Sequence, residues 1–261
     1  YDLSGNAIAS ATLSGACMGV AVNATGVYVA AQDEGRGFVT AKYDYNLVLS
    51  SEAVLPGGAS ERGIALDASG NVYVIGDNWG EPGNQKDYKL VKYNANLAQI
   101  SSAIFNAGGW DEGTGIAVDN GNIYITGDSF LTGGATTFVT AKFDSTSMAF
   151  ISSVAYANGY QSNSSISAEK LAVNPVTHDV YFVGASGTEG ASDILTIKYS
   201  QNLQQLGIAA FAGAAYDEGT DITLDNAGNV YALGKNQAAG SDYAVLLKYN
   251  SNLVFLSSAT K

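Results

Sequence analysis

The sequence predicts an all-β fold, a β-propeller of five blades that are each built from four antiparallel strands. A Lys followed by an aromatic residue recurs five times along the 261 residues, at spacings of 50, 50, 56 and 50. Each copy holds four short runs rich in β-branched and aromatic residues, separated by turn residues, whereas no stretch has the 3.6-residue apolar period of an amphipathic helix. Four hairpin-linked strands repeated in tandem are typical of propeller blades.

The first strand of each unit is a short apolar run that ends in Asp or Asn. The five copies are Gly19–Asn23, Gly63–Asp67, Gly115–Asp119, Lys170–Asn174 and Asp221–Asp225. A turn follows, in which Gly and Asn supply the positive φ that a tight hairpin needs. The second strand then carries a tyrosine that we expect to pack between blades, at Tyr28, Tyr73, Tyr124, Tyr181 and Tyr231.

The third strand ends at the recurring lysine and leads through a turn to the fourth strand. The lysines are Lys42, Lys92, Lys142, Lys198 and Lys248. Five like charges in one channel would repel strongly, so we expect each lysine to lie along its sheet and pair locally, with Asp67, Asp119 and Asp225 as candidate partners. The blades are predicted at about 14–58, 59–109, 110–159, 160–215 and 216–261, in a single domain.

The N-terminal segment aligns with the end of a third strand and the fourth strand after it. It therefore adds a sixth fourth strand to five copies of the other three. Residues 1–13 are predicted to form an extra outer strand that helps to close the propeller beside the C-terminal blade. The alternative is self-association through strand addition to a neighbouring molecule.

The units resemble the bacterial SBBP-type β-propeller repeat, which reads roughly Gly-Ile-Ala-Val-Asp-x-x-Gly-Asn-Val-Tyr-Val-x-Gly. The resemblance spans residues 14–261 and is closest in Gly63–Gly76 and Gly115–Gly127, while the fourth unit departs from it with Lys170 and Asn174. The shorter NHL-type repeat is the alternative. The resemblance implies an exported or surface protein of bacteria and no shared catalytic residues.

The composition excludes several classes of protein. A net charge of -12 argues against binding to nucleic acid or to anionic membranes, and no apolar run is long enough for membrane insertion. One cysteine and one histidine exclude an internal disulfide and Cys–His zinc sites. Cys17 is expected to be a small buried residue and His178 to lie in a surface turn. The low fraction of charged residues suits a secreted or cell-surface protein.

The candidate ligand-binding residues lie on the loops at one end of the predicted strands, where scaffold-held functional residues generally sit. Aromatic rings there can stack on sugar rings, and acidic side chains can accept hydroxyl hydrogen bonds or hold Ca²⁺, although no dedicated calcium loop is present. The alternative is that the aromatic residues cap the core between blades. The candidates are Trp79, Trp110, Asp111, Glu112, Tyr160, Tyr216, Asp217 and Glu218.

Three functions are compatible with this pattern. The first is a non-enzymatic extracellular binding or scaffold propeller that takes a glycan or a protein partner, with Ca²⁺ as the one cofactor considered. The second is a polysaccharide hydrolase or lyase, which needs two carboxyl groups about 5–9.5 Å apart. Asp111, Glu112, Asp217 and Glu218 are the acidic candidates, with no catalytic residue singled out among them. The third is a self-assembling structural subunit of a filament or surface array.

Overall fold

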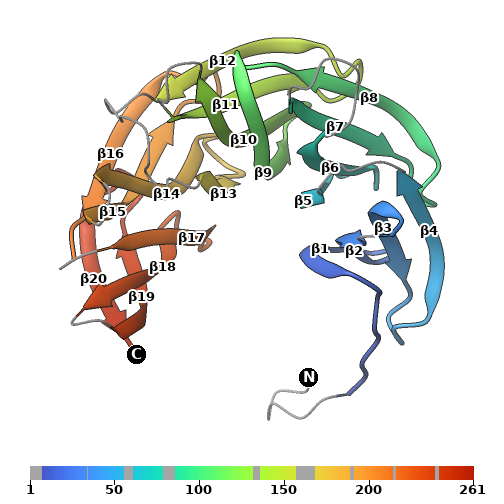
Figure 1. Ribbon diagram of the computed structural model, residues 1–261, viewed down its shortest axis with the longest axis horizontal. Helices are drawn as coiled ribbons and strands as arrows, with labels where there is room; N and C mark the ends of the chain where they lie inside the picture. Colours follow the sequence, from blue (N-terminus) through green and yellow to red (C-terminus); the bar gives the residue numbers. More distant parts are fainter. Residues whose placement is uncertain are drawn as a thin grey trace. The chain divides into compact units, whose positions relative to one another are not determined.

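A computed structural model of the protein describes residues 8–33, 35–55, 61–78, 86–131, 136–156, 168–188, 191–213, 216–238 and 241–261. These residues form 20 strands in five sheets of four antiparallel neighbours, and the strand order in each sheet follows the chain (Figure 1). The prediction of five four-stranded propeller blades is confirmed. None of the described residues forms a helix of the length and hydropathy that a membrane crossing needs. The chain divides into two compact units, residues 1–105 and 106–261.

The first unit contains two sheets. Their buried residues form one cluster, in which Tyr28 and Phe38 of the first sheet pack against Val72, Val74 and Tyr93 of the second. The first sheet consists of β1 (Ala16–Asn23), β2 (Gly26–Asp33), β3 (Gly37–Tyr43) and β4 (Leu49–Leu55), and the second of β5 (Glu61–Leu66), β6 (Val72–Asp77), β7 (Tyr88–Tyr93) and β8 (Gln99–Phe105).

The second unit contains three sheets, and the same kind of cluster joins each to the next. The third sheet comprises β9 (Gly109–Asp119), β10 (Asn122–Leu131), β11 (Thr136–Asp144) and β12 (Phe150–Tyr156). The fourth comprises β13 (Ala168–Val173), β14 (Val180–Thr188), β15 (Ala191–Tyr199) and β16 (Gln205–Phe211). The fifth comprises β17 (Asp217–Leu224), β18 (Val230–Ala238), β19 (Ser241–Tyr249) and β20 (Phe255–Thr260).

Burial along the strands follows their position in the sheet. The second and third strands are largely buried on both faces, since each sheet is covered by neighbouring sheets. The fourth strands β4, β8, β12 and β16 alternate between half-buried and exposed residues. The outer strand therefore shields the sheet interior from solvent on one side only.

Two kinds of turn shape the strand ends. In the first hairpins, the Asp67 carboxylate accepts hydrogen bonds from the amides of Ser69 and Asn71, at 2.9 and 2.8 Å. In the turns between third and fourth strands, a non-glycine residue adopts a left-handed backbone, with φ near 60° at Leu97, Leu203 and Leu253. A left-handed leucine is unfavourable by itself. Each of these leucines is buried in the core, which compensates for the backbone.

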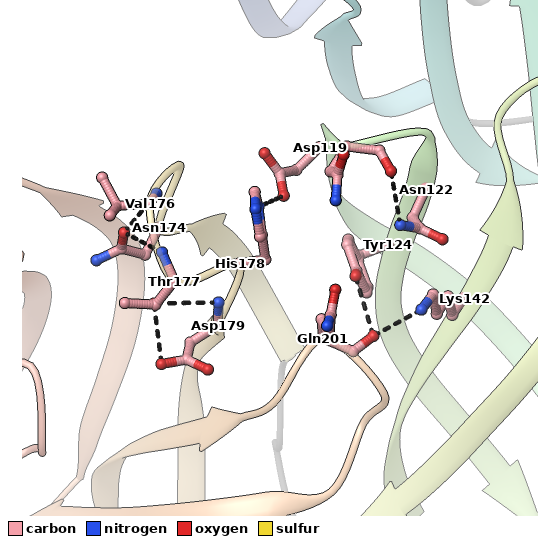
Figure 2. A network of polar contacts seen from close by, with 11 residues as sticks. Asp119, Asn122, Tyr124, Lys142, Asn174, Val176, Thr177, His178, Asp179 and Gln201 are labelled. Carbon is pink, nitrogen blue, oxygen red and sulfur yellow. Dashed lines mark hydrogen bonds and ion pairs between the residues drawn. The ribbon is translucent and has the colours of Figure 1, made fainter.

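The recurring Tyr and Lys form an inter-blade clamp, a pair that binds a main-chain carbonyl in the third-to-fourth turn of the next sheet. Tyr28 and Lys42 both donate to the Ala95 carbonyl, each at 2.9 Å. Tyr124 and Lys142 both donate to the Gln201 carbonyl, at 3.0 and 2.8 Å (Figure 2).

The clamp recurs with one change in the fourth sheet. Tyr181 donates to the Ser251 carbonyl at 2.8 Å, while Lys198 forms an ion pair with Asp179 at 2.9 Å. In all five sheets the lysine ammonium lies over the ring of the clamp tyrosine, 5.0–5.8 Å from its centroid, at a distance where cation–π attraction is significant. The lysine therefore has the structural place that we expected.

The predicted partners of the lysines are largely wrong. Asp119 does not pair with Lys142 but with His178, at 2.6 Å (Figure 2). Asp67 and Asp225 accept the hydroxyls of Tyr73 and Tyr231 and the amides of their own turns. The reason is local: a carboxylate at the end of the first strand meets the amides of the following turn before it can reach a lysine.

Two further expectations at the N-terminal end are wrong. Residues 8–13 form no strand and join none of the five sheets, while residues 1–7 lie outside the described part of the chain. Every third strand already pairs with the fourth strand of its own sheet, so no third strand is left to accept an extra one. Cys17 is exposed rather than buried, because it lies on the outer part of β1.

Candidate functional site

Two strands of the second unit begin with the same aromatic-Asp-Glu sequence. Trp110, Asp111 and Glu112 lie in β9, and Tyr216 directly precedes Asp217 and Glu218 in β17. Side chains alternate between the two faces of a strand. The aromatic residue and the Glu therefore share one face in each copy, and the Asp lies on the other.

The two aspartates are fully buried and hold the loop that precedes their strand. The Ala107 amide donates to Asp111 Oδ2 at 2.7 Å, and the Gly213 amide donates to Asp217 Oδ2 at 2.5 Å. The Gln237 amide also donates to Asp217 Oδ1 at 3.3 Å. Burial raises the pKa of Asp217, and these hydrogen bonds oppose the rise. The sequence predicted both residues as ligand-binding, whereas their contacts are those of loop anchors.

Trp110 lies at an exposed aromatic site in the third sheet. Its side chain is 47% exposed, and the residue opposite it in the β9–β10 register is Phe130, which is 41% exposed. The next pair on the same face is Glu112, half-buried, opposite the buried Asp128. We call Trp110, Phe130 and Glu112 the aromatic edge. Phe130 is absent from the sequence-based candidates, although the hairpin register, counted from the turn at Asn120, would have placed it opposite Trp110.

The equivalent position in the fifth sheet is different. Tyr216 is half-buried, and the Lys235 ammonium lies 5.8 Å from its ring centroid. Lys235 also pairs with Asp242 at 2.9 Å and lies opposite Glu218 in the register. A lysine thus occupies the ring face of Tyr216 that a sugar would need.

Trp79 and Tyr160 fall outside the described residues. The expected platform of Trp110, Tyr160 and Tyr216 therefore stays a prediction. Within the ranges that the structure describes, no group of three or more His, Cys, Asp or Glu side chains is placed to hold a metal ion. Calcium binding likewise stays a prediction.

A hollow of about 460 Å³ lies at the opposite strand ends, between the first hairpin turns of the fourth and fifth sheets. Asn174, Pro175 and Thr177 line one side, and Asp225 and Ala227 the other. We expected little concavity among these short turns, and this expectation is wrong. The carboxylate in the hollow already binds turn amides, since Ala227 and Asn229 both donate to Asp225 Oδ1 at 2.9 Å.

Comparisons with known proteins support the fold. No protein-family model and no curated protein matches the sequence, so the SBBP-type resemblance stays a prediction. Among solved structures, a GH43 β-1,3-galactosidase solved with galactodeoxynojirimycin is similar with a TM-score of 0.51 and 10% identity, over 97% of this chain and 95% of that one.

Two larger proteins are similar in the same way. The quinohemoprotein alcohol dehydrogenase of Comamonas testosteroni has a TM-score of 0.56 and 13% identity, over 94% of this chain and 43% of its own. The apocarotenoid oxygenase of Synechocystis has a TM-score of 0.53 and 11% identity, over 90% of this chain and 58% of its own. At such low identity, these likenesses show a shared propeller fold and carry no chemistry over.

Proposed function

We propose that the protein is a non-enzymatic, secreted or cell-surface propeller that binds a glycan through the aromatic edge. The observation that carries the proposal is the exposure of Trp110 beside Phe130 on one strand pair. An indole ring stacks on the apolar face of a sugar ring, and a neighbouring carboxylate such as Glu112 accepts hydrogen bonds from sugar hydroxyls. Large apolar side chains that stay exposed next to one another on a rigid sheet are typical of binding sites.

Binding is favoured over polysaccharide cleavage because of the contacts of the two aspartates. A glycosidase needs one carboxyl group that donates a proton and a second that attacks the sugar or activates water. The oxygens of Asp111 and Asp217 instead accept main-chain amides inside the protein. Neither aspartate has the exposure that either role in cleavage requires.

A glycan array followed by calorimetry with the best ligand tests the proposal. Trp110→Ala and Phe130→Ala should each weaken binding at least about tenfold, since one lost stacking contact costs on the order of 1 kcal/mol or more. Phe150→Ala is the matched control, because Phe150 is equally exposed in the same sheet but lies at the opposite strand end. It should leave the affinity unchanged.

Two results would refute this function. Glycan binding that survives both substitutions would place the ligand elsewhere. Release of reducing sugar by the wild-type protein, abolished by Asp217→Asn, would instead support the hydrolase.

A further inference from the structure

The fifth sheet has an open face that is covered in the preceding sheet of the same unit. Leu233 and Leu246 lie opposite each other on β18 and β19, and each is 42% exposed. The residues at the same positions in the fourth sheet, Val183 and Thr196, are 0% exposed. We call Tyr231, Leu233, Leu246 and Lys248 the open face, since the register places all four on one side of the sheet.

The fourth sheet shows what this kind of face binds. Its Tyr181 and Val183 pack in one cluster with Ile222, on the first strand of the next sheet, and with Leu253, in that sheet's third-to-fourth turn. The Tyr181 hydroxyl donates to the Ser251 carbonyl in the same turn. The face thus recognises an apolar first strand and a turn carbonyl together.

In the fifth sheet the clamp residues turn back on their own sheet. The Lys248 ammonium lies 5.0 Å from the Tyr231 ring centroid, and the Tyr231 hydroxyl donates to Asp225 Oδ2 at 3.2 Å. Among the described residues, neither residue donates to a turn carbonyl. The clamp is therefore formed and lacks the partner that the corresponding pairs have.

The first sheet presents the complementary surface. Val20 in β1 is 66% exposed, whereas the residues at its position in β13 and β17, Leu171 and Ile222, are buried. In its third-to-fourth turn, Leu47 has the left-handed backbone of the buried leucines, with φ of 60°, but stays half-buried. The carbonyl of Tyr45 occupies the position that Gln201 and Ser251 hold in the clamped turns.

We propose that the open face of the fifth sheet binds the first sheet of a second copy of this chain. The partner's Val20 covers Leu233 and Leu246, and its Tyr45 carbonyl accepts hydrogen bonds from Tyr231 and Lys248. The contact continues an interface that the molecule already uses between its fourth and fifth sheets. Because the two surfaces differ, each added copy retains one open face, and the assembly is head-to-tail. The aromatic edge takes no part, so this proposal is independent of the proposed function.

Sedimentation velocity of the full chain over a range of concentrations tests the proposal. The wild type should form dimers and larger species as the concentration rises. Val20→Asp and Leu246→Asp should each abolish self-association, because each places a charge in an apolar contact. Val176→Asp is the control, since Val176 is strongly exposed in a turn outside both surfaces, and it should assemble like the wild type.

Mixing the two defective variants gives the decisive measurement. The Val20→Asp chain keeps its fifth-sheet face, and the Leu246→Asp chain keeps its first-sheet face. An equimolar mixture should therefore form a 1:1 dimer that grows no further. Lys248→Met should weaken wild-type assembly by about tenfold, in line with the loss of a charged hydrogen bond.

Three results would overturn the proposal. The first is a wild type that stays monomeric at every concentration. The second is an equimolar mixture that forms no dimer although circular dichroism shows both variants folded. The third is a monomer whose melting temperature falls with either substitution, since both faces would then be covered within one chain.

Discussion

Replacing Lys142 with Met tests whether the inter-blade clamp stabilises the second unit. Lys142 is almost fully buried, and its ammonium donates to the Gln201 carbonyl at 2.8 Å and to Asn202 Oδ1 at 3.3 Å. Methionine keeps most of the apolar stem, and the Gln201 carbonyl retains the hydrogen bond from Tyr124. The substitution therefore removes the charged contacts and leaves no buried acceptor without a partner.

The expected loss of unfolding free energy is about 1.5 kcal/mol. A hydrogen bond to a charged group contributes roughly 1.5–3 kcal/mol and the cation–π contact with Tyr124 about 0.5–1 kcal/mol. Burial of the ammonium, which lowers the pKa of Lys142, offsets part of this gain. In a domain of this size the loss corresponds to a fall in melting temperature of about 3–6 °C, measured by calorimetry.

Lys235→Met is the matched control. The Lys235 ammonium has the same 5.8 Å distance to a tyrosine ring, at Tyr216, and an ion pair with Asp242, but its side chain is 39% exposed. Exposed pairs contribute little, so the melting temperature should change by less than about 2 °C. If Lys142→Met lowered the melting temperature no more than Lys235→Met, the clamp would not be a stabilising contact.

Two further predictions concern the turns and the buried tyrosines. Leu203→Gly should lower the unfolding free energy by about 2–3 kcal/mol in urea titrations, because the lost buried side chain outweighs the relieved left-handed backbone, whereas Leu47→Gly should change it by less than about 1 kcal/mol; equal losses at the two sites would contradict this reasoning. Burial raises the pKa of Tyr199 to about 12. Its contribution to stability is therefore fully present below pH 10 and is lost between pH 10 and 12, where the unfolded chain releases a proton that the folded chain keeps. Tyr199→Phe should accordingly raise the midpoint of alkaline unfolding, followed by circular dichroism, and an unchanged midpoint would contradict the assignment.

The repeat made the fold predictable from sequence. Because Tyr73 and Lys92 recur at fixed offsets in every unit, the sequence gives strand number, strand order and approximate blade limits. It gives the contacts less well. The clamp lysines bind main-chain carbonyls, which every residue carries, so nothing in the letters at Ala95 or Gln201 marks them as acceptors. The left-handed leucines were missed for a similar reason, since the Asn residues of these turns are the ordinary candidates for positive φ.

The candidate site was partly predictable. The repeated aromatic-Asp-Glu sequence located Trp110 and Tyr216 at equivalent strand starts. It could not show that Lys235 lies over one ring while Phe130 accompanies the other, because both differences arise from the second strand of each hairpin. The buried positions of Asp111 and Asp217 depend on loops of variable sequence, whose amides bind the carboxylates.

The choice of a main-chain carbonyl as the clamp's acceptor has a consequence for how such a protein changes in evolution. The clamped turn residues are Ala95, Gln201 and Ser251, three side chains with nothing in common. The joint between neighbouring sheets therefore makes no demand on the side chain at its centre. A duplicated unit can follow any other unit without a compensating substitution there, and the turn surface stays free to acquire new side chains while the joint beneath it is preserved.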